Sequence, residues 1–159
     1  MGTEIERKYL LKNEEWKSDV TSKTRIKQGY LNSKKERTVR IRVRGEKGYL
    51  TIKGKNISAT RQEFEYAIPI SDAESMLLLC EKPIIEKVRS LITVNDKTWE
   101  IDEFAGENKG LIVAEIELKS EKEIFAIPSW IGKEVTQDSR YFNCNLISHP
   151  YSSFDKNTL

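Results

Sequence analysis

The sequence predicts an α+β protein that is mainly β, built as a closed antiparallel barrel with a charged lumen and helices packed outside. Charged and apolar residues alternate along most of the predicted strands of the 159-residue chain. The connections between these strands are mostly too short for parallel crossovers, which favours antiparallel neighbours. Because side chains alternate faces with a period of two, a sheet that curls into a barrel would turn the charged sets inward.

In the first half of the chain, alternation predicts strands at residues 4–11, 26–32, 36–45, 47–55 and 61–70. The segment NEEWKSDV, between the first two strands, is expected to form a helical turn. The turn-like run Gly45-Glu46-Lys47-Gly48 joins the third and fourth strands and predicts a hairpin. Pro69 is expected to end the fifth strand.

In the second half, residues 71–83 predict a helix, with Ser71 as its cap, Glu74 at the capping-box spacing and Pro83 as its stop. Strands are predicted at residues 84–94, 97–106 and 110–120, separated by turns at Asn95-Asp96 and at 107–110. The segment SEKEIFAIPSW is expected to be a short helix. The whole chain, residues 1–159, is expected to be a single domain, with 148–159 as a flexible polar tail.

Composition excludes several classes of protein. Lys and Arg (27) nearly balance Asp and Glu (25), so the net charge of +2 argues against a nucleic-acid partner. Cys80 and Cys144 are too few and too far apart for a disulfide framework, and we expect buried free thiols. No signal-like or membrane-spanning apolar run is present, which predicts a cytoplasmic protein without a membrane partner. His149 is the only histidine, so histidine-based catalysis is not expected.

The sign of the charged faces distinguishes a lumen from an ordinary solvated face. A sheet with one dry and one wet face would also alternate. Wet faces, however, usually mix small polar residues with charges of both signs, because like charges on neighbouring positions repel. Here Arg40, Arg42 and Arg44 share one strand face, and Glu115 and Glu117 share another. We therefore interpret these faces as opposing walls of an enclosed site.

Such a lumen predicts a phosphate chemistry. Six cations are expected to reach one axis and to bind a polyanion: Lys8, Arg40, Arg42, Lys53, Lys87 and Arg89. Four glutamates offer hard oxygen donors that suit Mg²⁺ or Mn²⁺ and not zinc: Glu4, Glu6, Glu115 and Glu117. Phosphoryl transfer needs both sets, since cations hold the phosphates and a metal positions or activates water.

The motif Glu4-Ile5-Glu6-Arg7-Lys8 resembles the ExExK signature of the CYTH proteins, also called triphosphate tunnel metalloenzymes. The segments TVRIR, YLTIKG, EFEYAIP, EKVR and AEIEL follow in that family's order, and the resemblance covers residues 2–147. It implies an eight-stranded antiparallel barrel forming a tunnel, in which the four glutamates hold the metal and the six cations hold a triphosphate. The segments QGYL and GKEVTQDSRYFNCNL are most similar to the small bacterial inorganic triphosphatases.

Several further residues are candidates for the site. Lys8, Tyr30 and Arg42 are the expected catalytic residues, with Tyr30 reaching Lys8 across the lumen to help activate water; a packed Tyr30 with a satisfied hydroxyl is the alternative. Glu63, Glu65 and Asp102 are expected either to counter the cations or to bind a second metal. Lys133, Arg140 and Tyr141 lie in a segment that could plug one tunnel mouth and contact the ligand.

The function predicted from these residues and the resemblance is metal-dependent hydrolysis of inorganic tripolyphosphate. The alternatives are a class IV adenylate cyclase, a thiamine or nucleoside triphosphatase, and, in a different class, a non-catalytic module that binds polyphosphate or RNA ends. An adenine pocket would indicate the cyclase, and tight binding without phosphate release would indicate the binding module. The expected partner is a small-molecule triphosphate, and a homodimer is an expectation from the resemblance.

Overall fold

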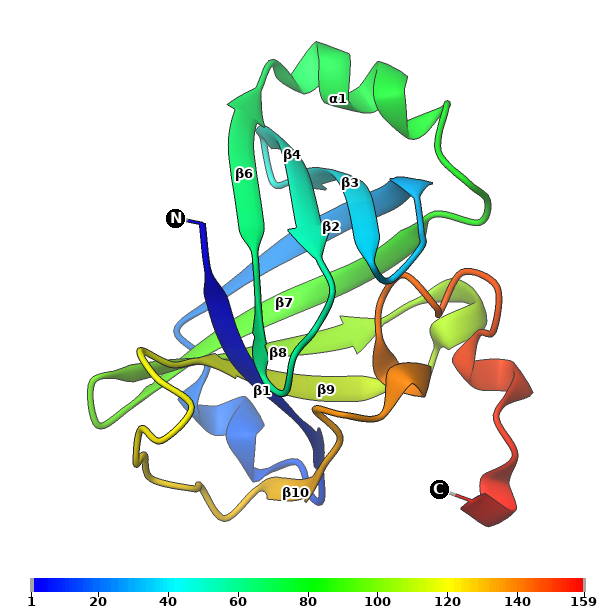
Figure 1. Ribbon diagram of the computed structural model, residues 1–159. Coiled ribbons are helices and arrows are strands. Elements are labelled where there is room, and N and C mark those ends of the chain that lie inside the picture. Colours follow the sequence, from blue (N-terminus) through cyan, green and yellow to red (C-terminus); the bar gives the residue numbers. More distant parts are fainter. Residues whose placement is uncertain (1, 159) are drawn as a thin grey trace.

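Strands make up most of the computed structural model of the protein, which describes residues 2–158 (Figure 1). They are β1 (Glu4–Leu11), β2 (Ser22–Asn32), β3 (Arg37–Arg44), β4 (Lys47–Gly54), β5 (Thr60–Arg61), β6 (Glu63–Ile68), β7 (Ile85–Val94), β8 (Lys97–Phe104), β9 (Ile112–Glu117) and β10 (Ile131–Glu134). The α-helix within the described range is α1 (Ile70–Leu77). Five 3-10 helices accompany it: η1 (Glu15–Asp19), η2 (Gly106–Asn108), η3 (Ser139–Tyr141), η4 (Tyr151–Ser153) and η5 (Lys156–Thr158).

The strands form one antiparallel sheet that curls into a nearly closed barrel. The order is β10-β1-β9-β8-β7-β2-β3-β4-β6, with β5 pairing with β1. One edge of β1 is taken by β9, and the other is shared by β5 and β10. Gly2 and Glu63 exchange two backbone hydrogen bonds of 3.0 and 3.3 Å, which join the chain start to β6. The predicted antiparallel barrel is confirmed. The strand count exceeds the implied eight because the short strands β5 and β10 also pair.

The predicted hairpin turns are confirmed and have a conformational reason. Asn95 and Asp96 connect β7 to β8 with φ of 48° and 64°. Positive φ at both central residues gives the turn a twist that matches its strands, and Asn and Asp tolerate this conformation. Gly45 has φ of 60° between β3 and β4. These tight turns keep consecutive strands in register.

Helix α1 lies outside the barrel and packs against β3 and β4 (Figure 1). A Cβ at Gly48 would lie 2.7 Å from the Cβ of Ala73, so the close approach of helix and strand requires this glycine. The predicted Ser71 cap is wrong, since the helix begins at Ile70 after Pro69 and has no side-chain cap. The helix also ends well before Pro83. The Glu81 amide donates to the Tyr30 carbonyl at 2.9 Å, which draws residues 78–83 toward β2.

The segment 120–130 is not the predicted helix. It is irregular, and it carries Phe125 and the buried Trp130 to the same ring, Trp99, with centroid distances of 5.9 and 5.7 Å. In an α-helix, residues five apart would point about 140° away from each other. The apolar contacts with Trp99 are therefore satisfied by an irregular backbone.

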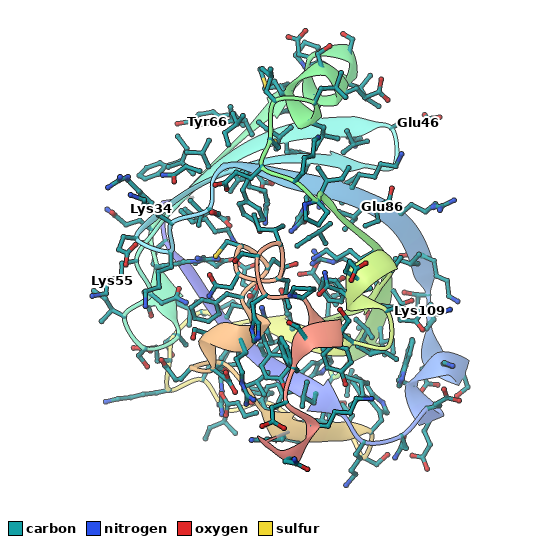
Figure 2. All side chains as sticks on the ribbon, turned by 90° about the vertical axis from the view of Figure 1, so that its right-hand side faces the viewer. Lys34, Glu46, Lys55, Tyr66, Glu86 and Lys109 are labelled. Carbon is teal, nitrogen blue, oxygen red and sulfur yellow. The ribbon has the colours of Figure 1, made fainter. Side chains whose placement is uncertain are left out.

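The chain after β10 covers one mouth of the barrel. Figure 2, viewed from the right-hand side of Figure 1, shows this orange-to-red segment in front of the ring of strands. Phe154 is buried in a cluster with Phe104 and Val113 of the strands, so part of the segment 148–159 packs on the barrel, which the expectation of a flexible tail did not anticipate. Within the described part of the chain, no helix has the length and apolar character needed to cross a membrane.

Candidate active site

The pairing register of the strands brings the charged side chains into one interior. Directly opposite residues on neighbouring strands point to the same face of a sheet. Arg89 lies opposite Asp102 and Lys8 lies opposite Glu115. The ionic faces predicted from alternation are therefore joined around a common lumen, while the apolar faces form the three core clusters.

All six cations predicted to bind a polyanion are buried in this lumen, and none is more than 9 % exposed: Lys8, Arg40, Arg42, Lys53, Lys87 and Arg89. Two pockets occupy the lumen. They share the lining residues Glu4, Glu6, Arg40, Arg42, Lys53, Arg89 and Glu115, so the two form one continuous cavity. Burying this many charges is costly unless they are paired or bind a ligand, so the arrangement indicates a built site.

The two ends of the cavity differ in chemistry. The segment after β10 contributes Thr136, Phe142, Asn143 and Cys144 to one end. The other end opens among side chains that are mostly acidic: Arg44, Glu63, Glu65, Glu100 and Glu117. The cavity is thus covered by the C-terminal segment at one end and framed by carboxylates at the other.

Glu4 holds two cations. The Lys53 Nζ lies 3.0 Å from each of its carboxylate oxygens, and the Arg61 Nε lies 3.3 Å from one of them. Burial alone would raise the pKa of Glu4, but the charges of Lys53 and Arg61 outweigh it and lower the pKa to about 2. Glu4 is therefore ionised over the whole physiological range.

Asp102 is paired with two of the lumen cations. It is fully buried, accepts two 2.8 Å hydrogen bonds from the Arg89 guanidinium, and lies 2.7 Å from the Lys87 Nζ. Burial would raise the pKa of Asp102, but Arg89 and Lys87 hold it well below its usual range. Both oxygens are occupied, so the structure favours the counter-charge role over the metal role.

Glu63 and Glu65 have similar partners. Glu63 lies 3.1 Å from Lys53, and Glu65 lies 3.3 Å from Arg40 and accepts a 3.0 Å hydrogen bond from Thr51. Both glutamates are partly exposed at the acidic mouth. These pairs likewise favour counter-charge.

Three carboxylates crowd together and could hold a metal. Glu6, Glu100 and Glu115 each offer one oxygen, and these oxygens lie within 4.8 Å of one another. Burial, then the charges of Glu115 and Glu4, raise the pKa of Glu6 well above its usual value. Burial also acts to raise the pKa of Glu115, but Lys8 and then Arg89 outweigh it, and the pKa is about 2. A divalent cation would relieve the repulsion at Glu6, so the donor set fits a hard, oxygen-binding metal.

Glu6 and Glu115, two of the four predicted metal ligands, belong to this cluster. Glu4 is held by its cations, and Glu117 is an exposed residue at the acidic mouth. Glu100, which lies opposite Glu115, was not among the predicted ligands. Glu100 lies between Trp99 and Ile101 in the predicted strand 97–106, so the alternation of charged and apolar residues could have identified it.

Lys8 and Tyr30 both line the cavity but have different partners. The Lys8 Nζ donates to the Tyr141 carbonyl at 3.0 Å and lies 3.5 Å from Glu115. The Tyr30 hydroxyl accepts a 3.2 Å hydrogen bond from Gln28, and burial raises the pKa of Tyr30 to about 12. Among the hydrogen bonds of residues 2–158, none joins Lys8 to Tyr30. A satisfied, protonated Tyr30 is what this geometry favours.

The structure does not bring Lys133 and Arg140 to the lumen. Lys133 is exposed on the short strand β10. Arg140 is held by Asp138, which caps η3, with a 2.6 Å contact between the Nη2 and Oδ2 atoms. Tyr141 contributes its backbone carbonyl through the bond to Lys8.

Arg61 and Asn143 are among the other lining residues that the sequence prediction missed. In RQEFEYAI, Arg61 belongs to the same alternating set as Glu63 and Glu65, so its position facing the lumen could have been predicted from the alternation. Asn143 accepts a 3.0 Å hydrogen bond from Lys87. It lies in a loop, where charged and apolar residues do not alternate regularly. No sequence signal places such a residue.

The chain is similar over nearly its full length to known proteins. It is 48% identical over 155 residues to a protein of Acetivibrio thermocellus named inorganic triphosphatase, covering 97% of this chain and 99% of that one. It is 33% identical over 145 residues to an inorganic triphosphatase of Nitrosomonas europaea, covering 89% and 94%. The crystal structure of the inorganic triphosphatase NE1496 matches with a TM-score of 0.65 and 33% identity, over 92% of this chain and 95% of that one.

A family model described as the CYTH domain matches residues 2–151. This match spans every strand of the barrel and all the lumen residues described above. The chain therefore belongs to the CYTH domain family.

Proposed function

We propose that this protein is a metal-dependent triphosphatase that hydrolyses inorganic tripolyphosphate at a terminal phosphoanhydride bond. The observation that carries the proposal is the convergence of six buried cations and a carboxylate cluster on one cavity. The names of the two relatives, which share 48% and 33% identity with this chain, support the same activity. We also propose that residues 1–159 act as one domain, while the cytoplasmic location and the homodimer stay predictions from the sequence.

The cations suit a linear chain of phosphates. A single phosphate would not need six of them, whereas a triphosphate spreads its charge along the cavity axis. The guanidinium groups of Arg40 and Arg42 come from β3 and that of Arg89 comes from β7, and such planar forks match phosphate oxygens. We assign Lys8, Lys53 and Lys87 to the remaining oxygens as point charges.

The carboxylates fit Mg²⁺ or Mn²⁺, which prefer hard oxygen donors. Glu6, Glu100 and Glu115 would hold the ion, with Glu4 and Glu117 beside them. When bound, such an ion neutralises charge on phosphate oxygens and positions or activates water. The choice of Mg²⁺ or Mn²⁺ as the bound ion is part of the proposal.

The residues of the chain would bind and orient the reactants. Water adds to the terminal phosphorus while the bond to the bridging oxygen breaks, which yields orthophosphate and pyrophosphate. Arg42 is buried in the wall where the two pockets meet and is placed to donate to oxygens on which charge develops. The ammonium of Lys8 faces the same cavity beside Glu115 and is assigned to the attacking end.

A nucleotide substrate finds less support in the lining. The aromatic side chains that line the two lumen pockets are Tyr30 and Phe142, and most of the remaining lining residues are charged or polar. An adenine ring needs an apolar or stacking surface. This cavity therefore favours tripolyphosphate over ATP.

The experiment that tests the proposal compares initial rates of phosphate release from tripolyphosphate, ATP and thiamine triphosphate, each with Mg²⁺ or Mn²⁺. We expect tripolyphosphate to be the fastest substrate and EDTA to stop the reaction. Formation of cyclic AMP from ATP would show a cyclase instead. Tight, salt-sensitive binding without phosphate release under either metal would show a non-catalytic binding module.

A further inference from the structure

Arg42 differs from the other five lumen cations in its partner. Each of the others has a carboxylate within ion-pairing distance: Lys8 with Glu115, Arg40 with Glu65, Lys53 with Glu4, and Lys87 and Arg89 with Asp102. Over the described residues, no carboxylate makes such a pair with Arg42. Its guanidinium instead donates to the side-chain oxygen of Gln28, from Nε at 2.9 Å and from Nη2 at 2.7 Å.

Gln28 is held rigidly in this position. It is 0 % exposed and lies directly opposite Arg42 in the pairing of β2 with β3. Its Nε2 donates to the Tyr30 hydroxyl and to the Asn143 Oδ1, both at 3.2 Å. Every polar atom of the Gln28 side chain therefore has a partner.

The network also fixes which way the two amides face. Arginine and lysine side chains only donate, so Arg42 requires the oxygen of Gln28, and Lys87, 3.0 Å from Asn143 Oδ1, requires the oxygen of Asn143. With its oxygen toward Arg42, Gln28 presents its NH₂ group to Asn143. The four side chains Arg42, Gln28, Asn143 and Lys87 thus agree on one arrangement, which reaches from the barrel wall to the C-terminal segment.

A neutral amide has a specific consequence at this position. A carboxylate could accept the same two hydrogen bonds but would cancel the charge of Arg42. Burial, and next the charges of Arg40 and Arg89, lower the pKa of Arg42 to about 9, so it remains protonated at neutral pH. The protein therefore holds a buried, oriented and uncompensated positive charge in the wall of the cavity.

We propose that Gln28 is a positioning residue that fixes the Arg42 guanidinium and leaves its charge uncompensated for the triphosphate. Since this role is defined for a triphosphate ligand, it rests on the function proposed above. Gln28 would orient Arg42 toward the phosphate oxygens without competing with them. The other cations must be drawn from their carboxylates, whereas Arg42 is ready before the ligand arrives.

The test measures tripolyphosphate binding by calorimetry in EDTA, together with thermal stability and with hydrolysis in Mg²⁺. Gln28→Glu keeps the shape and the two acceptor positions but adds a charge. We expect its melting temperature to be unchanged or higher, and its affinity for tripolyphosphate to fall about 10-fold or more, with a weaker salt dependence. The matched control is Gln62→Glu, which adds the same charge at an exposed position, and we expect its affinity to stay within about 2-fold of wild type.

A second variant separates orientation from charge. Gln28→Met keeps the side-chain length and leaves Arg42 charged but unheld. We expect the salt dependence of tripolyphosphate binding to persist while kcat falls about 10-fold, because the guanidinium is no longer aligned. An unchanged kcat in Gln28→Met would overturn the proposal. This test holds even if Gln28→Glu does not fold.

Other outcomes are also decisive. Equal losses of affinity in Gln28→Glu and Gln62→Glu, or none in either, would overturn the role of Gln28. A wild-type protein that binds tripolyphosphate without hydrolysing it would refute the triphosphatase, and a selective loss of binding in Gln28→Glu would still support this inference. A wild-type protein that does not bind tripolyphosphate would overturn both.

Discussion

The Lys53 Nζ lies 3.0 Å from both carboxylate oxygens of Glu4, so a predicted substrate cation is paired with a predicted metal ligand. Arg61 contacts the same carboxylate at 3.3 Å. A metal that used Glu4 would have to compete with these two cations. A phosphate that drew Lys53 away would make Glu4 available, so the binding of metal and of triphosphate should favour each other.

Lys53→Met should therefore bind Mn²⁺ more tightly than wild type in the absence of substrate. We expect a gain of about 3- to 10-fold, since one competing charge is removed, and a weaker affinity for tripolyphosphate. Calorimetric titration with Mn²⁺ measures the first effect. Lys55→Met is the control, because Lys55 is exposed on the outside of the barrel (Figure 2). Unchanged Mn²⁺ affinity in Lys53→Met would show that Glu4 takes no part in metal binding.

Glu115→Gln should destabilise the metal-free protein. The pKa of Glu115 is lowered to about 2, so its contribution to stability is fully present above its unfolded pKa of about 4.5 and is lost as the pH falls through about 2. A shift of this size corresponds to roughly 3 kcal/mol. Urea unfolding in EDTA should show the largest deficit of the variant near neutral pH. A deficit that is the same at pH 2.5 and pH 7 would contradict the ionic explanation.

Glu6→Gln should have the opposite effect. The pKa of Glu6 is raised, so the folded protein favours its protonated form more than the unfolded chain does, and stability is lost as the pH rises above the unfolded pKa of Glu6. The variant should melt at a higher temperature than wild type in EDTA at pH 7, and this advantage should shrink as the pH falls and Glu6 takes up a proton. Added Mn²⁺ should stabilise wild type but not the variant. A lower melting temperature of Glu6→Gln than of wild type in EDTA would contradict the repulsion of Glu6 by Glu115 and Glu4.

Asp102→Asn tests counter-charge against metal binding. Removing this fully buried charge leaves Arg89 and Lys87 without their shared partner, which should cost about 3–5 kcal/mol of unfolding free energy. Folded Asp102→Asn should bind Mn²⁺ as wild type does. Asp96→Asn, at the exposed turn between β7 and β8, is the matched control. Loss of Mn²⁺ binding in Asp102→Asn with little loss of stability would assign Asp102 to the metal.

Tyr30→Phe tests the hydroxyl as a proton acceptor. Burial raises the pKa of Tyr30 to about 12, and its hydroxyl is bonded to Gln28. Since Tyr30 stays protonated at neutral pH, Tyr30→Phe should show the same dependence of kcat on pH as wild type, even if kcat itself changes. The profile is measured from pH 6 to pH 10 with saturating tripolyphosphate. Disappearance of an ionisation from the profile would restore Tyr30 as a base.

The sequence predicted most of the charged strand residues that line the lumen but not how they pair there. Alternation has a fixed period of two, so Arg40, Arg42 and Glu115 could be assigned to one face without knowledge of their neighbours. The pairing of Lys53 with Glu4 depends on barrel closure between β1 and the β5–β6 region, which no local pattern contains. The same limit explains why the neutral partner of Arg42, Gln28, was not foreseen.

Two further parts of the structure lay beyond the sequence signals. Strand β10 has four residues, one of them Gly132, and forms because β1 offers a free edge beside β5. The segment that covers one mouth shows no regular alternation of charged and apolar residues. It is held by apolar packing on the barrel and by polar contacts such as Lys8 to the Tyr141 carbonyl and Lys87 to Asn143. Tertiary contacts of this kind decide position without leaving a repeating pattern.

The most direct test of the catalytic lumen is ³¹P NMR of tripolyphosphate incubated with the protein, with Mg²⁺ and then with excess EDTA. We expect conversion to equal amounts of orthophosphate and pyrophosphate with Mg²⁺, no conversion in EDTA, and at least about 100-fold slower conversion by Glu115→Gln. Conversion that continues in EDTA, or that is unaffected by Glu115→Gln, would contradict it.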